Sequence, residues 1–393
     1  VAALRAPGVA PGLLRSGTTR RTGFVALSDV APTILDALGI PAPESMEGSP
    51  VHVSATGGSA TDRQAFLIRA NEDGLLRDRL VTPVGNAVAW TAIALALGTV
   101  FLLGRVTWAG RALQWVGLGL IGFMLGTFVI VLFHASQHGG VATFWIFTVL
   151  FAFAFAALCR RLGRRGQLDP LILALGAVVL VLTVDNLTGA HLEFNAVFGY
   201  SATVGIRLAG NGNVAFAILG ACAVLLAGLL AWRIVPHGTR IAIGLLAVVL
   251  VAFTPPLFGQ DFGGTIAAAP AFLVLAWLLL GRRIRVRTCL AFAGVLVLSG
   301  LVVGFVDLLR PADQRTHVGR FFAKVGNEGW AGFATVLQRK GGENASTLAS
   351  WVSVLVVVVV VAAVVVLWCR APRRLRPIVA TVPTLRAVAV ALG

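Results

Sequence analysis

Nine long runs of uncharged, mostly apolar residues dominate this sequence. The hydrocarbon interior of a bilayer is about 30 Å thick, and a helix of roughly 20 apolar residues crosses it. Inside that hydrocarbon the backbone must satisfy its own hydrogen bonds, so each run predicts a membrane-spanning helix. The runs are Val84 to Leu103, Trp115 to Phe133, Val141 to Leu158, Leu171 to Val184, Val214 to Trp232, Ile241 to Leu257, Thr265 to Leu280, Cys289 to Val306 and Trp351 to Trp368.

The composition excludes the other broad classes of protein. Of the 393 residues, 58% are hydrophobic and only 12% are charged, about half the roughly 25% charge of a soluble domain. We therefore predict an α-helical, polytopic bundle of nine or ten membrane helices, with a small α/β remnant of an extracytoplasmic domain at its N-terminus. Four cysteines without paired spacing indicate neither a disulfide framework nor a zinc site: Cys159, Cys222, Cys289 and Cys369.

The net charge of +16 raises the question of a nucleic-acid partner. Its distribution argues against one, because the arginines gather in alternate connections, whereas the short connections after the second, fourth and sixth runs carry only Arg207. Positive short loops stay cytoplasmic. The arginines after runs 1, 3, 5, 7 and 9 are Arg105, Arg111, Arg160, Arg161, Arg164, Arg165, Arg233, Arg240, Arg282, Arg283, Arg285, Arg287, Arg370, Arg373, Arg374 and Arg376. We predict a multi-pass protein of the bacterial inner membrane, with residues 1–83 and 307–350 outside the cytoplasm.

The chain divides into a polar region, residues 1–83, and a membrane domain, residues 84–393. Within the latter, segment 307–350 mixes charged and aromatic residues, and the spacing of Phe322, Val325 and Phe333 predicts amphipathic helix on the outer membrane face or closing over the bundle. The alternative is a helical hairpin that packs on the bundle and binds no ligand. The sequence begins at Val1 and ends inside another apolar stretch, Ile378 to Leu392, so we expect it to be a fragment of a longer polypeptide.

Residues 17–50 predict a small α/β unit. Phe24 to Leu27 reads as a short strand, and Ser28 or Asp29 as the cap of a helix over Ala31 to Leu38. Gly39 follows at the position where helices end in a left-handed conformation. The run Thr18, Thr19, Arg20 and Arg21 predicts a solvated turn, with an anion site as the alternative, and His52 reads as a surface residue.

These residues resemble a known family. The stretches that carry the resemblance are Thr19-Arg20-Arg21, Ser28-Asp29-Val30-Ala31-Pro32-Thr33-Ile34-Leu35, Leu38-Gly39-Ile40-Pro41 and Met46-Glu47-Gly48. They are similar to the C-terminal end of an alkaline-phosphatase-like domain of the sulfatase and phosphotransferase superfamily. Such domains use two divalent metals, held by Asp and His, and a Ser or Thr nucleophile, all in motifs upstream of the matched part. The resemblance therefore implies no metal and no cofactor in this fragment, and a capping role for Asp29.

The membrane part resembles polytopic actinobacterial and firmicute membrane proteins of unknown activity that carry such a domain before their helices. The stretches concerned are Leu187 to Asn195, Phe198 to Ser201, Arg207 through Asn213, Asp261 to Gly264, and Arg339-Lys340 with Asn344. This second resemblance implies an architecture and no reaction.

Polar residues collect in the connections predicted to face outward. Ionisable groups near membrane depth are costly and mark pathways or sites. The candidate site residues are Asp185, His191, Glu193, Asn195, Arg207, Asn211, Asn213, Asp261, Arg339 and Lys340. In the functional interpretation, Arg207, Arg339 and Lys340 hold a phosphate or another anion, and Asp185, His191 and Glu193 handle protons or cations. The alternative is a wet loop whose charges pair with one another.

Two short motifs in this region give little support to a metal site or a nucleotide site. The spacing of His191 and Glu193 is too short a signal for a metal site, and residues 209–213 do not complete a nucleotide-binding glycine motif.

Three functions follow as hypotheses, and whether the chain belongs to an enzyme stays open. By fold-level analogy, the first is action on a phosphorylated or sulfated envelope lipid or glycan at the outer membrane face, with membrane lipid as the partner. The second is a transporter or lipid flippase with a regulatory soluble domain. The third is a structural anchor for the soluble domain.

Overall fold

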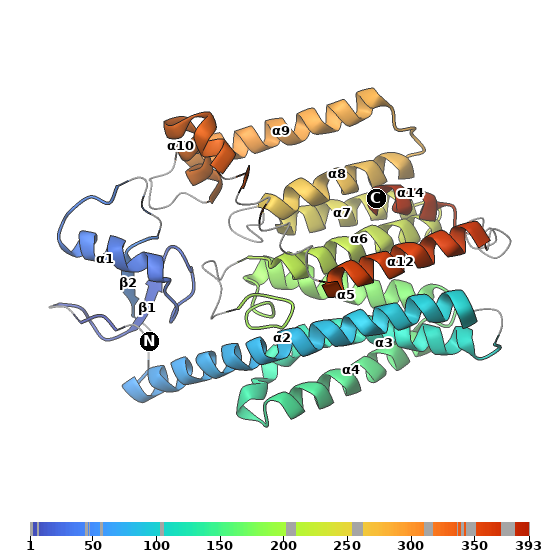
Figure 1. The fold of residues 1–393 in the computed structure, drawn as a ribbon, viewed down its shortest axis with the longest axis horizontal. Coiled ribbons are helices and arrows are strands. Elements are labelled where there is room, and N and C mark those ends of the chain that lie inside the picture. The colour runs from blue at the N-terminus through green and yellow to red at the C-terminus, as the bar shows by residue number, and fades with distance from the viewer. Residues whose placement is uncertain are drawn as a thin grey trace.

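The computed structural model describes most of the chain. The described residues are 3–5, 8–43, 46, 48–55, 58–102, 106–201, 210–253, 262–309, 317–335, 337–338, 342, 351–370 and 382–392. Over these residues the protein is an α-helical, multi-pass membrane bundle with a small α/β unit beyond one end (Figure 1).

Each of the nine apolar runs coincides with a helix. The bundle helices are α2 (Ala60–Leu102), α3 (Ala109–Val129), α4 (Val141–Leu162), α5 (Asp169–Thr188), α6 (Asn213–Arg233), α7 (Gly238–Phe253), α8 (Phe262–Leu279), α9 (Val286–Leu308), α12 (Trp351–Arg370) and α14 (Thr384–Leu392). Six of the described helices are long and apolar enough to cross a membrane, and Gly238–Phe253 and Ala267–Leu279 are shorter apolar helices. The sixth run ends as a helix at Phe253, and the Pro255-Pro256 pair lies outside the described residues.

Successive helices from α2 to α9 run in opposite directions, so their connections gather at the two ends of the bundle (Figure 1). One end, here called the arginine end, holds the connections at residues 163–168, 234–237 and 280–285. The other, the polar end, holds the connections at 130–140 and 189–201 and the N-terminal α/β unit. The positive-inside rule predicts that the arginine end faces the cytoplasm.

Arginines at the arginine end contact aromatic rings and a carboxylate. The guanidinium of Arg160 lies 4.9 Å from the ring centroid of Trp115, and that of Arg282 lies 4.7 Å from the ring centroid of Trp277. Arg233 Nε donates to Asp169 Oδ1 at 2.9 Å. Such amphipathic rings prefer the membrane–water interface, so these contacts fit the headgroup level on this side.

Three hydrophobic clusters hold the described part of the bundle together, the smallest of them formed by Leu118, Ala156, Cys159 and Ala174 of α3, α4 and α5. Of the other two, the larger joins α3, α5, α6, α7, α8 and α14, with Phe128, Leu182, Leu219 and Phe253 completely or almost completely buried. The smaller joins α2 to α3, α4 and the polar-end connections, through residues such as Leu80 and Val84. α14 completes the larger cluster by lying so close to α6 that a Cβ on Gly228 would meet the Val388 side chain at 2.2 Å.

The N-terminal unit consists of two strands and one helix. β1 (Leu13–Ser16) pairs antiparallel with β2 (Val51–Ser54), with Leu13 opposite Ser54. α1 (Val30–Ala37) lies between the two strands in the sequence. Gly39 follows it with φ +69°, the left-handed conformation predicted at this position.

The strand predicted at Phe24 to Leu27 is wrong. The backbone groups there bond to side chains instead of a neighbouring strand: Thr19 Oγ1 donates to Phe24 O at 2.7 Å, and Ala26 N donates to Asp29 Oδ2 at 2.8 Å. The apolar pattern of this stretch had no partner strand to pair with, and side-chain bonds of this kind compete with ladders.

Asp29 occupies the N-cap position of α1, but its carboxylate makes no capping hydrogen bond to that helix. It accepts from Thr18 Oγ1 at 2.5 Å, from Ala26 N, and from Ser49 N at 3.0 Å. Asp29 is fully buried. Its role is therefore to join three parts of the N-terminal unit, which corrects the capping role predicted from the sequence.

α2 has no break at the domain boundary predicted at residue 83. It runs for 43 residues with Pro83 inside it, so one helix carries the chain from the N-terminal unit into the bundle. In segment 307–350 the structure has α10 (His317–Glu328), in agreement with the predicted amphipathic helix.

Close helix contact makes α3 sensitive to a single methyl group. A Cβ on Gly122 would lie 2.7 Å from the Phe155 ring of α4, whereas a Cβ on Gly117 of the same helix would meet nothing within 4 Å. We predict that Gly122→Ala destabilises the protein by about 1–3 kcal/mol through overpacking, measured as a lower midpoint of thermal unfolding in detergent. Gly117→Ala is the control, since Ala favours a helix over Gly by about 1 kcal/mol. Equal midpoints for the two variants would contradict the α3–α4 contact.

Candidate functional site at the polar end

Asp185 lies in the last turn of α5 and fixes the connection that follows. Its side chain is almost completely buried. Oδ1 accepts from Leu192 N at 2.8 Å, and Oδ2 accepts from Glu193 N at 3.2 Å. α5 ends at Gly189, whose left-handed φ of +110° lets Ala190 N return to the Asp185 carbonyl at 2.7 Å. The Gly189 N–H also donates to the Asp185 carbonyl, so one residue accepts from four backbone donors as the chain leaves the membrane helix.

Glu193 performs a similar task at the start of α6. It is fully buried, and Oε2 accepts from the backbone N of Gly212, the N-cap of α6, at 2.7 Å. The positive end of the helix dipole favours a carboxylate at that point. Tyr200 N donates to Glu193 O at 2.9 Å, and Gly199 packs so closely that a Cβ there would lie 1.9 Å from the same oxygen. Only glycine fits at position 199.

Arg21 reaches this connection from the N-terminal unit. Its Nη2 donates to Ala190 O at 2.7 Å and to Gly189 O at 3.2 Å, and the guanidinium lies 4.4 Å from the ring centroid of Phe194. Burial lowers the pKa of Arg21, while the nearby Asp185 carboxylate acts in the opposite direction. The predicted turn is present at residues 17–19 and 22–23, but the Arg21 guanidinium is not simply solvated, because it docks the unit onto the bundle.

A second aromatic contact extends that docking. The rings of Phe24 and Phe194 meet edge to face with centroids 4.9 Å apart, a favoured geometry for aromatic pairs. Thr19, next to this contact, is also buried. The interface between unit and bundle therefore combines ring packing with charge-assisted hydrogen bonds.

α2 supports the same connection from the other side. Arg77 Nε donates to Ala196 O at 3.4 Å, and its Nη2 donates to Gly199 O at 3.3 Å. Arg77 also pairs with Asp78 at 3.1 Å, and Asp78 accepts from Ser201 Oγ at 3.1 Å. Residues 193–201 are thus held by α2, α5 and α6 together.

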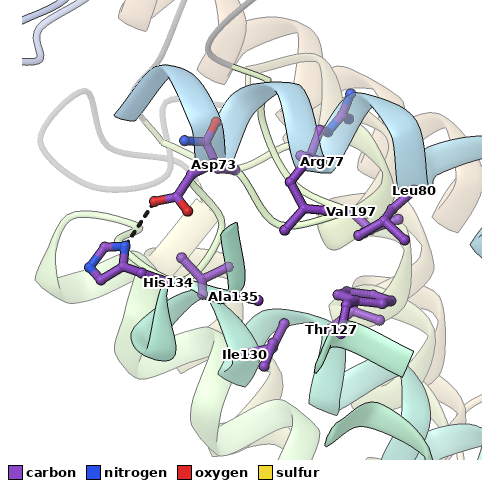
Figure 2. Close-up of a pocket in the computed structure, with 12 residues that line it drawn as sticks. Asp73, Arg77, Leu80, Thr127, Ile130, His134, Ala135 and Val197 are labelled. Atoms are coloured by element: carbon purple, nitrogen blue, oxygen red, sulfur yellow. Dashed lines mark hydrogen bonds and ion pairs between the residues drawn. The ribbon is translucent and has the colours of Figure 1, made fainter. Parts of the chain in front are cut away.

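The connection between α3 and α4 contacts α2 about one helical turn before Arg77. Asp73 accepts from Ser136 Oγ at 2.5 Å and lies 2.8 Å from His134 Nδ1, and Gln137 Nε2 donates to Glu72. His134 has φ +44°, a left-handed conformation rare for a residue with a side chain. Figure 2 shows the dashed Asp73–His134 contact bordering a small cavity that Arg77, Thr127 and Val197 also line. Its volume of about 30 Å³ has room for about one or two waters.

A larger groove of about 500 Å³ follows the outer side of α5. Leu180, Val181, Val184 and Leu192 line its apolar part, and its polar residues belong to the last turn of α5 and the residues after it. Those polar residues are Asp185, Thr188 and His191. The groove therefore changes from apolar to polar along the direction in which α5 leaves the membrane.

The structure brings six of the ten predicted site residues to the junction of α5 and α6. Asp185, Glu193 and Asn211 are buried, His191 and Asn213 are exposed, and Asn195 lines the small cavity. The other four, Arg207, Asp261, Arg339 and Lys340, lie outside the described residues. His191 and Glu193 share no ligand set, because the Glu193 carboxylate is buried against Gly212. The described part of the chain contains no group of three or more His, Cys, Asp or Glu that could hold a metal ion.

Sequence reasoning missed three residues of this region, Asp73, Arg77 and His134, and assigned Arg21 only to a turn. A signal existed for two of them. Asp73 and Arg77 are four residues apart, next to Leu76 and Leu80 at the same spacing, so a helix continued upstream of Val84 would have placed them on a face that meets the bundle. Nothing in the sequence pairs Arg21 with residues 189–194.

Comparisons of the chain with protein-family models, with curated proteins and with solved structures found no match.

We predict that Asp185→Asn weakens the polar end. An amide oxygen can replace one carboxylate acceptor, but the amide NH₂ would face the second backbone N–H, at a cost of about 1–3 kcal/mol. Hydrogen exchange at residues 190–194 should therefore become faster. Asp169→Asn, at the opposite end of α5, is the control, because its pair with Arg233 is partly exposed and is worth about 0–1 kcal/mol. Unchanged exchange at residues 190–194 in Asp185→Asn would show that the carboxylate does not hold this connection.

We also predict that Arg21→Ala releases the N-terminal unit. Hydrogen bonds to a charged donor contribute about 1.5–3 kcal/mol, so exchange at residues 189–194 should accelerate roughly tenfold to a hundredfold. Arg69→Ala, which removes an exposed arginine from α2, should leave this exchange unchanged. The same acceleration in both variants would contradict a specific role for Arg21.

Proposed function

We propose that this membrane protein acts at its polar end on an envelope lipid or lipid-linked glycan that carries a phosphate. In this proposal the N-terminal unit is the membrane-proximal end of an alkaline-phosphatase-like domain, and the polar end faces away from the cytoplasm. The observation that carries the proposal is the docking of Arg21 onto residues 189 and 190, directly after the helix that bears the α5 groove.

The groove supports a lipid as the molecule acted on. Its apolar lining lies on α5, where Leu180 is 64% exposed and Val184 is 48% exposed on a helix long enough to span the membrane. An acyl chain in this groove would carry its headgroup to Thr188 and His191.

The docking supports an extramembrane domain that works on that headgroup. A soluble domain tethered by a flexible linker would sample many positions relative to the bilayer. Here Arg21, the Phe24–Phe194 contact and the uninterrupted α2 hold the unit against the bundle. Fixed placement of a reacting group beside its substrate is a main source of catalytic rate.

The resemblance of residues 19–48 supplies the reaction class, transfer or hydrolysis of a phosphate or sulfate ester. The divalent metals of that chemistry would belong to the motifs that precede the matched part in such domains. The described residues offer no ligand group for them, so the roles proposed for this part of the chain are binding and positioning.

A transporter or lipid flippase is the second candidate, and one observation favours it. Asp185, Asn186 and Glu193 are buried polar residues at the end of the bundle, and Thr183 is buried one turn below Asn186. In transporters such residues mark ion or substrate pathways.

We predict that the groove binds lipid in preference to other lipid-facing surface. In nanodiscs that contain phosphatidylglycerol with a diazirine in its acyl chain, photolabelling should concentrate on residues 180–192. Val184→Trp should fill the groove and reduce that labelling several-fold. Val295→Trp on α9, a residue 55% exposed, should leave it unchanged. Equal labelling of α5 and α9, insensitive to Val184→Trp, would contradict a lipid site in the groove.

Assays in proteoliposomes can distinguish transport from enzymatic activity. Flipping of a fluorescent lipid that is lost in Asp185→Asn, while hydrolysis of a phosphorylated lipid headgroup by the native polypeptide is unaffected, would favour the flippase. Metal-dependent headgroup hydrolysis that falls in Arg21→Ala, without loss of hydrolysis of soluble bis-p-nitrophenyl phosphate, would favour the enzyme.

A further inference from the structure

α9 is a membrane helix that the bundle barely covers. Only 6% of its most apolar 18-residue stretch is buried within the protein. Large side chains on all sides are exposed, including Leu298 at 62% and Phe305 at 63%. In Figure 1 α9 lies at the edge of the bundle, beside α8. Apolar surface of this extent, on a helix long enough to cross a membrane, favours contact with lipid over contact with water.

α10 is attached to the end of α9 by a buried carboxylate. Asp307, near the C-terminus of α9, is 4% exposed, and its Oδ2 accepts from Gly319 N of α10 at 2.8 Å. The Phe322 ring lies against Gly304, where an added Cβ would meet it at 2.2 Å. These two contacts fix α10 at the level where α9 leaves the membrane, at the polar end (Figure 1).

An aromatic cluster continues the apolar surface of α9 beyond α10. The ring centroids of Phe321 and Phe333 are 6.2 Å apart, and those of Trp330 and Phe333 are stacked at 5.0 Å. Trp330 is nevertheless 78% exposed. α10 also carries polar residues, with Lys324 Nζ 3.8 Å from Glu328 Oε2 and with Asn327 exposed.

We propose that residues 317–335 form an interfacial anchor, with the aromatic cluster Phe321, Phe322, Trp330 and Phe333 set into the headgroup region of the bilayer at the polar end. Two independent observations lead to lipid as the occupant. The cluster is continuous with the exposed apolar surface of α9, and its most exposed member is a tryptophan, the residue type that concentrates at membrane interfaces. A helix that carries both aromatic and charged residues, held at the end of a membrane helix, is suited to lie in the interface plane.

The anchor explains how α9 keeps its depth in the membrane. A helix with few bundle contacts is free to slide or tilt, at a cost of only fractions of a kcal/mol per Å of mismatch. An interfacial helix joined to its end by Asp307 and Phe322 resists that movement. This role is independent of the function proposed for the α5 groove.

The anchor is tested by measuring the depth of position 330 in the full chain. Trp330→Cys and Asn327→Cys are made in a variant with Cys159, Cys222, Cys289 and Cys369 replaced by Ala, labelled with NBD, and reconstituted into phosphatidylcholine vesicles. Lipids with a nitroxide near the headgroup and aqueous iodide serve as the two quenchers. The probe at 330 should be quenched by the nitroxide lipid and protected from iodide, and the probe at 327 should show the reverse.

A second measurement uses the unmodified chain and so does not depend on how the cysteine variants fold. A lipid with a diazirine in its headgroup should label residues 330–335 and leave residues 324–328 largely unlabelled. Iodide quenching at both positions would overturn the proposal by placing the cluster in water. Protection from iodide without nitroxide quenching would overturn it as well, since protein rather than lipid would then cover Trp330.

Discussion

Backbone polar groups that leave a membrane helix must find partners close to the hydrocarbon, and this requirement organises the polar end of the protein. Buried carboxylates supply those partners repeatedly. Asp185 accepts two backbone donors after α5, Glu193 accepts one at the start of α6, and Asp307 accepts one from α10. Since leaving a buried donor unsatisfied costs about 1–3 kcal/mol, each acid determines the path of the chain beyond its helix. The residues that follow these helices are therefore held in place by hydrogen bonds, and the N-terminal unit contacts those after α5.

The requirement that backbone polar groups find partners near the hydrocarbon also decides how much of the fold the sequence predicts. The bilayer imposes a length and an uncharged composition on each crossing segment, so each of the nine runs predicts the position of a helix, although α2 begins 24 residues before its run. The α/β unit was harder to predict, because its apolar stretches are short. Phe24 to Leu27 has the pattern of a strand, yet its backbone bonds to Thr19 and Asp29, and such local competition is not visible in a pattern of apolar residues.

The sequence predicted those site residues whose residue type is unusual beside a membrane helix. It did not predict contacts between residues that are far apart in the chain. Asp185 and Glu193 stood out because acids next to membrane helices are expensive, and both are buried and bonded as such acids must be. Arg21 lies 168 residues from one of its acceptors, and no periodicity links the two. The charges at Asp73 and Arg77 looked like the end of a soluble region, because the composition changes near residue 83 while the helix does not.

Because α2 is continuous, a single helix contacts both of the connections at the polar end. A helix needs no hinge residue to pass from water into lipid if its side chains change from polar to apolar along one face, and α2 does this between Arg77 and Val84. The same helix holds the α3–α4 connection through Asp73 and the α5–α6 connection through Arg77. With Arg21 fastened to the second of these connections, the N-terminal unit is joined to the bundle at two separated points. A body attached at one point can swing, whereas a body attached at two points can only rotate about the line between them. Arg21 therefore restricts the movement of the unit relative to the outer end of α5 more than the chain connection into α2 would alone.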